Sequence, residues 1–280
     1  MDEIDALPTS LVRLSIGTFA NPDGLFCYAN STVQCLLDLI PHTTLSCLKE
    51  FKTIVGKFKS CTTQSLHALR SDVKHGCDLN RRQDPADFFY WLLKTPPYST
   101  LYPYFQMRVE EKHICSNNIC GNIINSMVSD QAYYDLQATT CNSSVQDMLV
   151  GSQEDSITDR CCVTCQSFMK QSTCIVSVSD YFVVKIHPVS NDGVIKDPTL
   201  IKGIPDCHLK IAANRFKFNC LVRHCGDLDE FSAHYVAWIK KNNKWLCASD
   251  QCVEPQRKWP TNGYDRSGKK SPYLLFYRRV

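Results

Sequence analysis

The sequence has little net charge and no long basic segment. Its formal charge is +3, and Lys and Arg never follow one another in a run of more than two residues. Proteins that bind nucleic acid carry a basic stripe or patch that neutralises phosphates. We therefore expect no nucleic acid among the partners of this protein.

The sequence also lacks long apolar runs and targeting signals. A membrane-spanning helix needs about 18 or more consecutive apolar residues, and no such stretch occurs. The first residues, MDEIDALPTS, are acidic and do not show the basic and then apolar order of a secretory signal peptide. These absences predict a protein without a membrane span that works in the cytosol, the nucleus or both.

Cysteine, in contrast, is abundant. The chain contains 17 cysteines, an odd number, without a signal peptide, which argues against a disulfide framework. Several of them, such as Cys35, Cys220 and Cys247, lie inside apolar runs and are expected to be small buried hydrophobic residues. A single cysteine is therefore weak evidence for chemistry in this chain.

The chain up to about residue 93 is predicted to be helical. Apolar side chains recur at i, i+3, i+4 and i+7 from Val33 to Ile40, and Pro41 ends this pattern. A second helix is expected to start at Asp84, which is a suitable N-cap, with Pro85 in the first helical position.

The C-terminal part of the chain is predicted to form strands. Its short segments rich in aromatic and β-branched residues are Tyr181–His187, Phe218–Arg223, Tyr235–Lys240, Trp245–Ala248 and Tyr273–Arg279. Asn242 lies in a predicted hairpin turn between the third and fourth of these segments. Residues 102–179, in between, are polar, rich in cysteine and weakly periodic. This order predicts an α+β fold without internal repeats.

Cys27 stands where the first predicted helix begins. Gly24 supplies a flexible turn before it, and the helix starts at or directly after the cysteine. A thiol in that position faces unpaired backbone N–H groups and the positive end of the helix dipole, which stabilise a thiolate. The same N–H groups could bind an oxyanion. Cys27 is therefore the candidate nucleophile, although a buried structural cysteine explains the same pattern.

His234 is the candidate base. It immediately precedes a predicted strand, and after the hairpin the chain returns with Ser249 and Asp250. A strand, turn and strand of this length bring the two ends together, so one of these residues is expected to hold the imidazole ring. The alternative interpretation is a strand-end histidine bonded to backbone, with Asp250 as a loop carboxylate.

Two pairs of closely spaced cysteines predict a metal site in the middle segment. The four residues are Cys115, Cys120, Cys162 and Cys165. Four sulfurs in two such pairs can enclose one tetrahedral Zn²⁺, which would supply folding energy to a segment with few apolar residues. Cys161 could replace Cys162, and His113 is a spare ligand. A hairpin with four free thiols is the alternative.

Taken together, these segments resemble the ubiquitin-specific proteases, a family of papain-like cysteine deubiquitinases. In FCYANSTVQCLL and the residues before it, the positions that match the first box of the family are Gly24, Cys27, Tyr28, Asn30, Ser31, Gln34 and Leu36. In AHYVAWIKKNNKWLCASDQCV, those that match the second box are His234, Tyr235, Trp245, Asp250 and Val253. RQDPADF resembles the acidic helix start that the family carries between the boxes, and YLLFYRR closes the match. All of them occur in the family's order.

The resemblance implies a papain-like α+β fold with a thumb, fingers and palm in a single catalytic domain. They are expected at about residues 1–100, 101–179 and 180–280. The implied reaction is hydrolysis of the peptide or isopeptide bond after the C-terminal Gly-Gly of ubiquitin, so ubiquitin and ubiquitylated proteins are the expected partners of a monomeric enzyme. Many members carry two cysteine pairs at the fingertips, which agrees with a structural Zn²⁺; no cofactor is implied for catalysis.

The resemblance also implies roles for residues that bind the substrate. Asp84 would hydrogen-bond the backbone of the incoming ubiquitin tail, and Asp87 would pair with an arginine of that tail. Tyr235 and Tyr273 would line the narrow channel that admits only two glycines. Helix capping and complementation of the helix dipole are the alternative roles of the two aspartates.

Three positions depart from the family's pattern. The family usually has an asparagine five residues before the nucleophile as an oxyanion donor, and here that position is Pro22, with Asn21 one residue earlier as the candidate replacement. Ala233 replaces the usual glycine before the histidine. Ser249 stands where most members have Asp or Asn, although some active members use serine there.

Three functions are compatible with these residues. An active deubiquitinase is favoured because Cys27 and His234 are both retained. A catalytically inactive scaffold that binds ubiquitin is the second, and the missing oxyanion asparagine supports it. A protease for another ubiquitin-like modifier is the third, because a fold does not fix the substrate.

Overall fold

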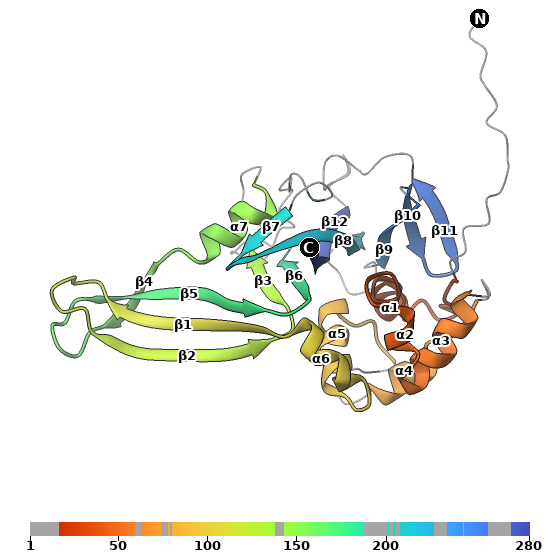
Figure 1. Ribbon diagram of the computed structural model, residues 1–280, viewed down its shortest axis with the longest axis horizontal. Helices are drawn as coiled ribbons and strands as arrows, with labels where there is room; N and C mark the ends of the chain where they lie inside the picture. Colours follow the sequence, from red (N-terminus) through yellow and green to blue (C-terminus); the bar gives the residue numbers. More distant parts are fainter. Residues whose placement is uncertain are drawn as a thin grey trace, which may run out of the picture.

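The computed structural model describes residues 17–59, 63–73, 78, 80–137, 143–187, 201, 204, 208–226, 234–242, 244–256 and 270–280. Its helices are α1 (Cys27–Leu39), α2 (His42–Leu45), α3 (Lys49–Lys59), α4 (His67–Asp72), α5 (Pro85–Lys94), the 3-10 helix η1 (Tyr98–Leu101), α6 (Tyr102–Phe105) and α7 (Val145–Ser152). Its strands are β1 (Met107–Cys115), β2 (Ile123–Gln131), β3 (Tyr134–Gln137), β4 (Ser156–Cys161), β5 (Phe168–Val178), β6 (Tyr181–His187), β7 (His208–Ile211), β8 (Asn214–Cys225), β9 (His234–Lys241), β10 (Lys244–Ser249), β11 (Cys252–Gln256) and β12 (Lys270–Arg279). Helices α1 to α6 form a lobe beside the main sheet, and a second sheet extends away from both (Figure 1).

Helix α1 is the central helix of this lobe. Almost all of its side chains are buried, because it packs against α5 as well as strands β8, β9 and β10. A helix that is buried on nearly all sides belongs in a core. It ends before Pro41, as the sequence predicts, and its first residue is Cys27. The candidate nucleophile therefore lies at the boundary between the helical lobe and the main sheet.

Helix α5 has the predicted N-terminus. The Asp84 carboxylate accepts a hydrogen bond of 2.6 Å from the backbone N–H of Ala86, and Pro85 occupies the first turn. Phe88, Phe89 and other apolar residues of α5 are buried, which fixes the helix against α1.

The main sheet contains eight strands in the order β11-β10-β9-β8-β12-β6-β3, with β7 paired to β8. All pairs are antiparallel except β3 and β6. The five strands predicted from the sequence lie within β6, β8, β9, β10 and β12. Asn242 has a φ of 49° in the turn between β9 and β10, so the predicted hairpin is confirmed.

Alternate residues of the main sheet contribute to two cores. On the face that α1 covers, the buried residues include Cys220, Val222, Ala237, Leu246, Leu274 and Phe276. On the opposite face they include Leu221, Val236, Trp238, Leu275 and Tyr277. Because side chains pack against both faces of the sheet, strands β8, β9 and β12 are held rigidly in place.

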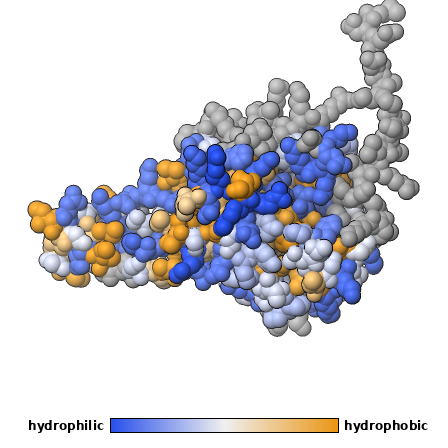
Figure 2. All heavy atoms as spheres, in the orientation of Figure 1, coloured by the Kyte–Doolittle hydropathy of each residue, from blue (hydrophilic) through white to orange (hydrophobic). Residues whose placement is uncertain are grey.

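The second sheet, which we call the extended sheet, has the strand order β2-β1-β5-β4. At its base Met107, Val109 and Ile175 belong to the second core of the main sheet. At its outer end large apolar side chains such as Ile119 and Val163 are exposed (Figure 2). The extended sheet is therefore anchored at one end, and little apolar packing stabilises the other.

None of the helices in the described part of the chain has the length and apolar character that crossing a membrane requires.

Candidate active site

The Cys27 side chain is 1% exposed at the first position of α1. Gly24 precedes it with a φ of +68°, a backbone conformation that favours glycine, and the Arg82 guanidinium donates to the Gly24 carbonyl at 3.2 Å. The backbone N–H groups of Tyr235 and Tyr28 act on the Cys27 sulfur and lower the pKa of its thiol. The predicted contact between the thiol and the start of the helix is thus present, and strand β9 adds a second N–H group.

His234 and Ser249 lie together at the ends of neighbouring strands. His234 is the first residue of β9, and Ser249 is the last residue of β10. The imidazole Nε2 lies 2.9 Å from the Ser249 hydroxyl oxygen. The proximity predicted from the hairpin length is confirmed, and it leaves Nδ1 as the ring nitrogen that can face another group.

Asp250 follows Ser249 but contacts different residues. Ser249 pairs with Cys252 across a tight turn, and Asp250 has a φ of 49° within that turn, so the two neighbouring side chains diverge. The Asp250 carboxylate accepts hydrogen bonds from the Asn21 amide at 2.8 Å and from the Asn30 amide at 2.7 Å. Asp250 therefore ties the loop before α1 and α1 itself to the turn that carries Ser249.

Asn21 is built into this network. Its side-chain oxygen accepts a hydrogen bond of 2.8 Å from the backbone N–H of Phe26, and its amide nitrogen donates to Asp250. The amide has two N–H hydrogens and one of them serves Asp250, so the other can serve a further acceptor. Pro22 has no side-chain donor, as the sequence indicates.

Burial disfavours the charged forms of both Cys27 and His234. Burial raises the pKa of the Cys27 thiol, and the Asp250 charge adds to this, while the N–H of Tyr235 and the Arg82 charge oppose it. Burial lowers the pKa of His234, and the negative charge of Asp250 opposes that shift. At neutral pH the site therefore rests as a neutral thiol and a neutral imidazole, which means that the thiol needs a base to react.

Two tyrosines and an aspartate of α5 lie beside this site. The rings of Tyr235 and Tyr273 are 5.6 Å apart, and the Tyr273 hydroxyl donates to the carboxylate of Asp84. Lys185 forms an ion pair with the same carboxylate at 3.2 Å. Together with the backbone N–H of Ala86, Asp84 is thus held by three donors. Asp87, one helical turn later, is exposed.

Two residues of this region were not predicted from the sequence. Arg82 acts on the pKa of both Cys27 and His234, and Lys185 is the ion-pair partner of Asp84. The signal for Lys185 was present, because a single cation interrupts an otherwise apolar strand. Arg82 lies on a loop next to the acidic helix start, and only the fold brings it to Gly24.

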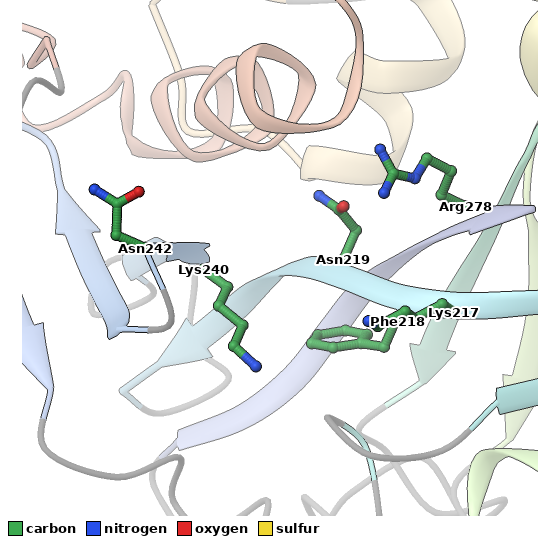
Figure 3. A pocket seen from close by; sticks show the side chains of 6 residues that line it. All are labelled: Lys217, Phe218, Asn219, Lys240, Asn242 and Arg278. Carbon is green, nitrogen blue, oxygen red and sulfur yellow. The ribbon is translucent and has the colours of Figure 1, made fainter. Parts of the chain in front are cut away.

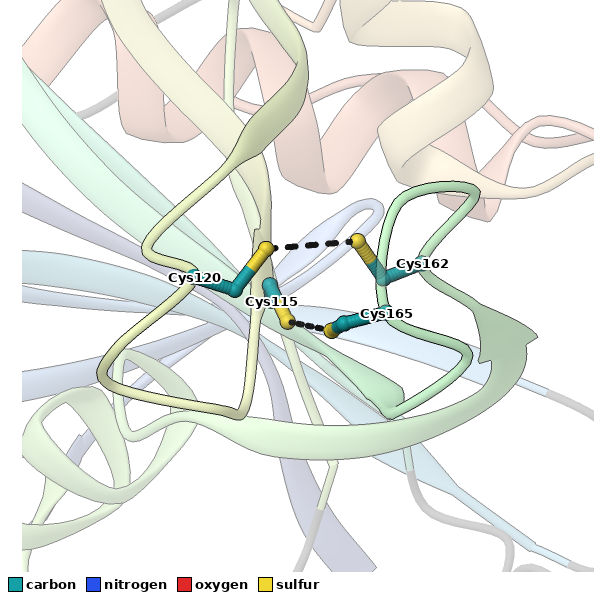
Figure 4. Close-up of side chains that lie close together, drawn as sticks. All are labelled: Cys115, Cys120, Cys162 and Cys165. Carbon is teal, nitrogen blue, oxygen red and sulfur yellow. Dashed lines mark hydrogen bonds between the residues drawn. The ribbon is translucent and has the colours of Figure 1, made fainter.

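The four predicted cysteine ligands converge at the outer end of the extended sheet (Figure 4). The sulfurs of Cys115 and Cys165 are 3.3 Å apart, those of Cys120 and Cys162 are 3.8 Å apart, and all four lie within 4.8 Å of one another. A tetrahedral Zn²⁺ with bonds of about 2.3 Å separates its sulfurs by about 3.8 Å. The cluster could therefore hold a metal ion.

The alternative ligands lie outside this cluster. Cys161 is exposed and is not one of the four converging residues, and His113 lies at 4.0 Å from Glu111 instead. Backbone N–H groups of Cys165 and Thr164 lower the pKa of the Cys162 thiol to about 6, which favours the thiolate that a metal binds. Ala233, the second departure noted in the sequence, lies outside the described residues.

Comparison with known proteins agrees with these observations. A family model described as ubiquitin carboxyl-terminal hydrolase matches residues 20–277. No curated protein sequence matches this chain. A chain of the SAGA DUB module Ubp8/Sgf11/Sus1/Sgf73, with a cysteine-to-alanine substitution in Ubp8 and bound to monoubiquitin, has a similar structure: the TM-score is 0.68 at 14% identity, over 95% of this chain and 69% of that chain. A chain of the same module bound to ubiquitin aldehyde gives a TM-score of 0.68 at 14% identity, over 95% and 70%. At this identity the similarity shows the fold, and the predicted papain-like α+β fold is confirmed.

Proposed function

This chain belongs to the ubiquitin carboxyl-terminal hydrolase family, a family of thiol-dependent deubiquitinating enzymes, and we propose that Cys27 is its nucleophile, His234 its base and Ser249 the group that orients the base. The observation that supports this assignment is the hydrogen bond of 2.9 Å between His234 and Ser249. The backbone N–H of Tyr235 also lowers the pKa of the Cys27 thiol. Tyr235 directly follows His234, so β9 carries both the base and a donor to the nucleophile.

The proposed reaction begins from the neutral pair. Nε2–H of His234 donates to Ser249, so Nδ1 accepts the thiol proton as the sulfur attacks the carbonyl carbon of the terminal glycine. The imidazolium then gives this proton to the leaving amine, the carbon–nitrogen bond breaks, and a thioester remains on Cys27. Water attacks the thioester with His234 as base again, which releases the glycine carboxylate and restores the thiol.

The oxyanion of each tetrahedral intermediate needs hydrogen-bond donors. The backbone N–H of Cys27 at the start of α1 is one donor, because the first N–H groups of a helix have no partner within the helix. Asn21 is the second proposed donor, through the amide hydrogen that Asp250 does not take. This arrangement replaces the family's asparagine, whose position Pro22 occupies.

The tail of ubiquitin is proposed to enter between Tyr235 and Tyr273. Asp84 holds Tyr273 and Lys185 in place and presents its carboxylate to the tail backbone. Asp87 has no ion pair with another described residue, and its pKa is raised by partial burial and then by the charges of Asp84 and Asp135. A cation of the tail would relieve this repulsion, so Asp87 is the proposed partner of a tail arginine.

Replacement of Asp87 with alanine should therefore weaken substrate binding and leave the chemical step intact. We expect KM for a ubiquitin C-terminal fluorogenic amide to rise about threefold to tenfold, with kcat nearly unchanged, since the pair is partly exposed. Asp87→Glu is the matched control and should retain most of the affinity. An equal fall in kcat for both variants would contradict the proposed role.

We propose that the ion held by the four cysteines is a structural Zn²⁺. Closed sites of four thiolates favour this metal, and it would stabilise the outer end of the extended sheet, where little apolar packing exists. By the family's architecture, the extended sheet then corresponds to the fingers, the helical lobe to the thumb and the main sheet to the palm. The metal takes no part in the reaction.

The zinc proposal predicts about one zinc per chain in freshly purified protein, measured by elemental analysis. Cys162→Ser should lose most of this metal and lower the melting temperature, because a thiolate ligand is removed. Cys161→Ser is the matched control, since Cys161 is the exposed neighbour outside the cluster, and it should keep both. Metal-free wild-type protein, or equal metal in the two variants, would refute the site.

Ubiquitin is the proposed partner, because the two similar structures are complexes with monoubiquitin and with ubiquitin aldehyde. The inactive scaffold is not favoured, since the chain retains Cys27 and His234 and His234 lies 2.9 Å from the Ser249 hydroxyl. The described cysteines are all free thiols, and we propose action in the cytosol or nucleus, where thiols stay reduced. Measuring turnover of fluorogenic amides of ubiquitin and of other ubiquitin-like modifiers tests whether the protein is an active enzyme and which modifier it cleaves. Turnover of ubiquitin alone supports the proposal, whereas turnover of another modifier alone would assign a different substrate.

A further inference from the structure

The turn that leads into α1 is clamped by a residue from another part of the chain. The N–H of Gly24 donates to the carbonyl oxygen of Asn21 at 3.3 Å, which closes the turn. The Arg82 side chain donates from Nε to the Gly24 carbonyl at 3.2 Å, across 58 residues of sequence. Arg82 lies on the loop before α5, so the turn before the nucleophile is tied to the entry of a second helix.

The guanidinium group of Arg82 lies against this turn. A Cβ atom at Gly24 would stand 3.7 Å from Nη2 of Arg82, and Gly24 has a φ of +68°, which residues with a side chain adopt only at a cost. The flat guanidinium therefore rests on the flank of the turn that carries no side chain.

Asp250 holds the other end of the same segment. Its carboxylate accepts a hydrogen bond from the Asn21 amide at 2.8 Å, and its carbonyl oxygen accepts one from the backbone N–H of Phe19 at 3.1 Å. The segment that carries Asn21, the proposed oxyanion donor, is thus held by an anion at one end and by the Arg82 cation at the other. Loss of either contact would let the Asn21 amide move relative to Cys27.

Arg82 and Asp250 also act in opposite directions on the reacting pair. Burial has the largest influence, since it raises the pKa of Cys27 and lowers the pKa of His234. Beyond burial, the Asp250 carboxylate raises both pKa values, and the Arg82 cation lowers both. Among the described groups, these are the two charges that bear on both residues. Arg82 therefore favours negative charge on the sulfur and, by the same sign, on an oxygen that becomes negative beside it.

The basic side chains of the main sheet have no such common focus. Three of them line a pocket of about 290 Å³. Asn219 and Arg278 in this pocket turn toward α1 (Figure 3), whereas Lys240 lies over the ring of Trp245 at 5.6 Å on the other face. These donors do not converge on one anion, but Arg82 has a defined place beside the reacting pair.

We propose that Arg82 is a positioning residue of the oxyanion site, which holds the Asn21 amide beside the backbone N–H of Cys27 and adds a fixed positive charge. This inference rests on the proposed hydrolysis at Cys27. The tetrahedral intermediate carries its negative charge on an oxygen next to the start of α1, where Pro22 contributes no side-chain donor. Arg82 transfers no proton in this role and acts through the turn and through its charge.

The test compares two substitutions of Arg82 on a ubiquitin C-terminal fluorogenic amide. Arg82→Gln keeps an N–H donor for the Gly24 carbonyl but removes the charge. We expect kcat to fall roughly tenfold or more, with KM changed less than about threefold. Arg82→Lys keeps the charge and should retain most of kcat. Arg81→Gln is the matched control, because Arg81 is an exposed neighbour that pairs with Asp78 at 3.6 Å, and it should behave as wild type.

The pH profile separates a charge effect from a loosened turn. Burial lowers the pKa of His234, the Asp250 carboxylate raises it, and the Arg82 cation lowers it. Removal of the cation raises this pKa, so the acidic limb of kcat/KM should move to higher pH in Arg82→Gln protein. The limb should stay in place in Arg82→Lys and Arg81→Gln proteins. A turn that is merely looser lowers the rate without moving the limb.

Ubiquitin with a thiol-reactive C-terminus separates failure of this inference from failure of the proposed function. Prolonged incubation should give the full adduct with Arg82→Gln protein, which shows that it is folded and binds ubiquitin. An adduct on Cys27 together with wild-type kinetics in Arg82→Gln protein would overturn the role of Arg82 alone. Equal losses in the Gln and Lys variants with an unmoved limb would also overturn it, since the charge would then have no part. No adduct with wild-type protein would overturn the proposed function and this inference with it.

Discussion

Cys27→Ala protein is expected to lose hydrolysis almost completely while still binding ubiquitin. The covalent route requires the sulfur, and alanine removes it without adding bulk at a position that is 1% exposed. Loss of a nucleophile costs about a thousandfold or more in turnover. Binding should persist, because the proposed tail contacts at Asp84, Asp87 and Tyr273 do not include the sulfur.

The matched control is Cys252→Ala. Cys252 is an exposed thiol that pairs across the turn with Ser249, so it is a thiol close to the base that is not assigned to catalysis. This variant should keep most of its activity on the fluorogenic amide. Residual turnover above a few per cent in clean Cys27→Ala protein, or loss in Cys252→Ala protein with Cys27 intact, would refute the assignment.

Ser249 and Asp250 are expected to act differently on the same histidine. Ser249→Ala removes the hydroxyl that contacts Nε2 and should lower kcat/KM about tenfold to a hundredfold. Asp250→Ala should cost at least as much, because it frees the amides of Asn21 and Asn30 and so loosens the loop before α1 from the turn.

The pH dependence separates a structural role of Asp250 from a purely electrostatic one. The negative charge of Asp250 raises the pKa of both Cys27 and His234, so its removal should lower both. The acidic limb of kcat/KM, where His234 loses its proton, should therefore move to lower pH in Asp250→Ala protein and stay in place in Ser249→Ala protein. Cys27 should also ionise more easily in Asp250→Ala protein, so its alkylation at a given pH should be faster than in the wild-type protein.

Charge alone would thus make the thiol of Asp250→Ala protein more reactive, yet we expect this protein to be slower. A rate that rises together with the ease of alkylation would show that Asp250 restrains the thiol and does not position the site. If Asp250→Ala leaves kcat/KM unchanged and Ser249→Ala abolishes activity, Ser249 alone orients His234. If Ser249→Ala leaves kcat/KM unchanged, Asp250 is the residue that orients the ring.

Local rules predicted the elements around the site well. Asp84 and Pro85 mark the start of α5, and Pro41 marks the end of α1, because caps and breakers act within a few residues. The hairpin at Asn242 fixed the register that brings His234 to Ser249. These features depend on backbone conformation and spacing, which a single sequence contains.

The extended sheet was the part that periodicity did not reveal. Strands such as β1 and β5 are intermediate or exposed along most of their length, so apolar and polar residues do not alternate as they do in a half-buried strand. Apolar residues of this segment are buried where it joins the second core, as Val109 and Ile175 show. The strands form because β1 pairs with neighbours on both sides.

Contacts between distant side chains were also beyond prediction. The carboxylate of Asp250 joins Asn21 and Asn30, and the carboxylate of Asp84 joins Tyr273 and Lys185. The resemblance to the family pointed to several of these residues, but not to the partners that they take in this chain. Such partners follow from packing, which depends on the whole fold.

The central claim, that Cys27 is the nucleophile of a deubiquitinase, is tested most directly with ubiquitin that carries a thiol-reactive group at its C-terminus. We predict one covalent adduct per chain, with the modification mapped to Cys27 by mass spectrometry and no adduct in Cys27→Ala protein. The absence of an adduct, or an adduct on another thiol such as Cys252, would contradict the account.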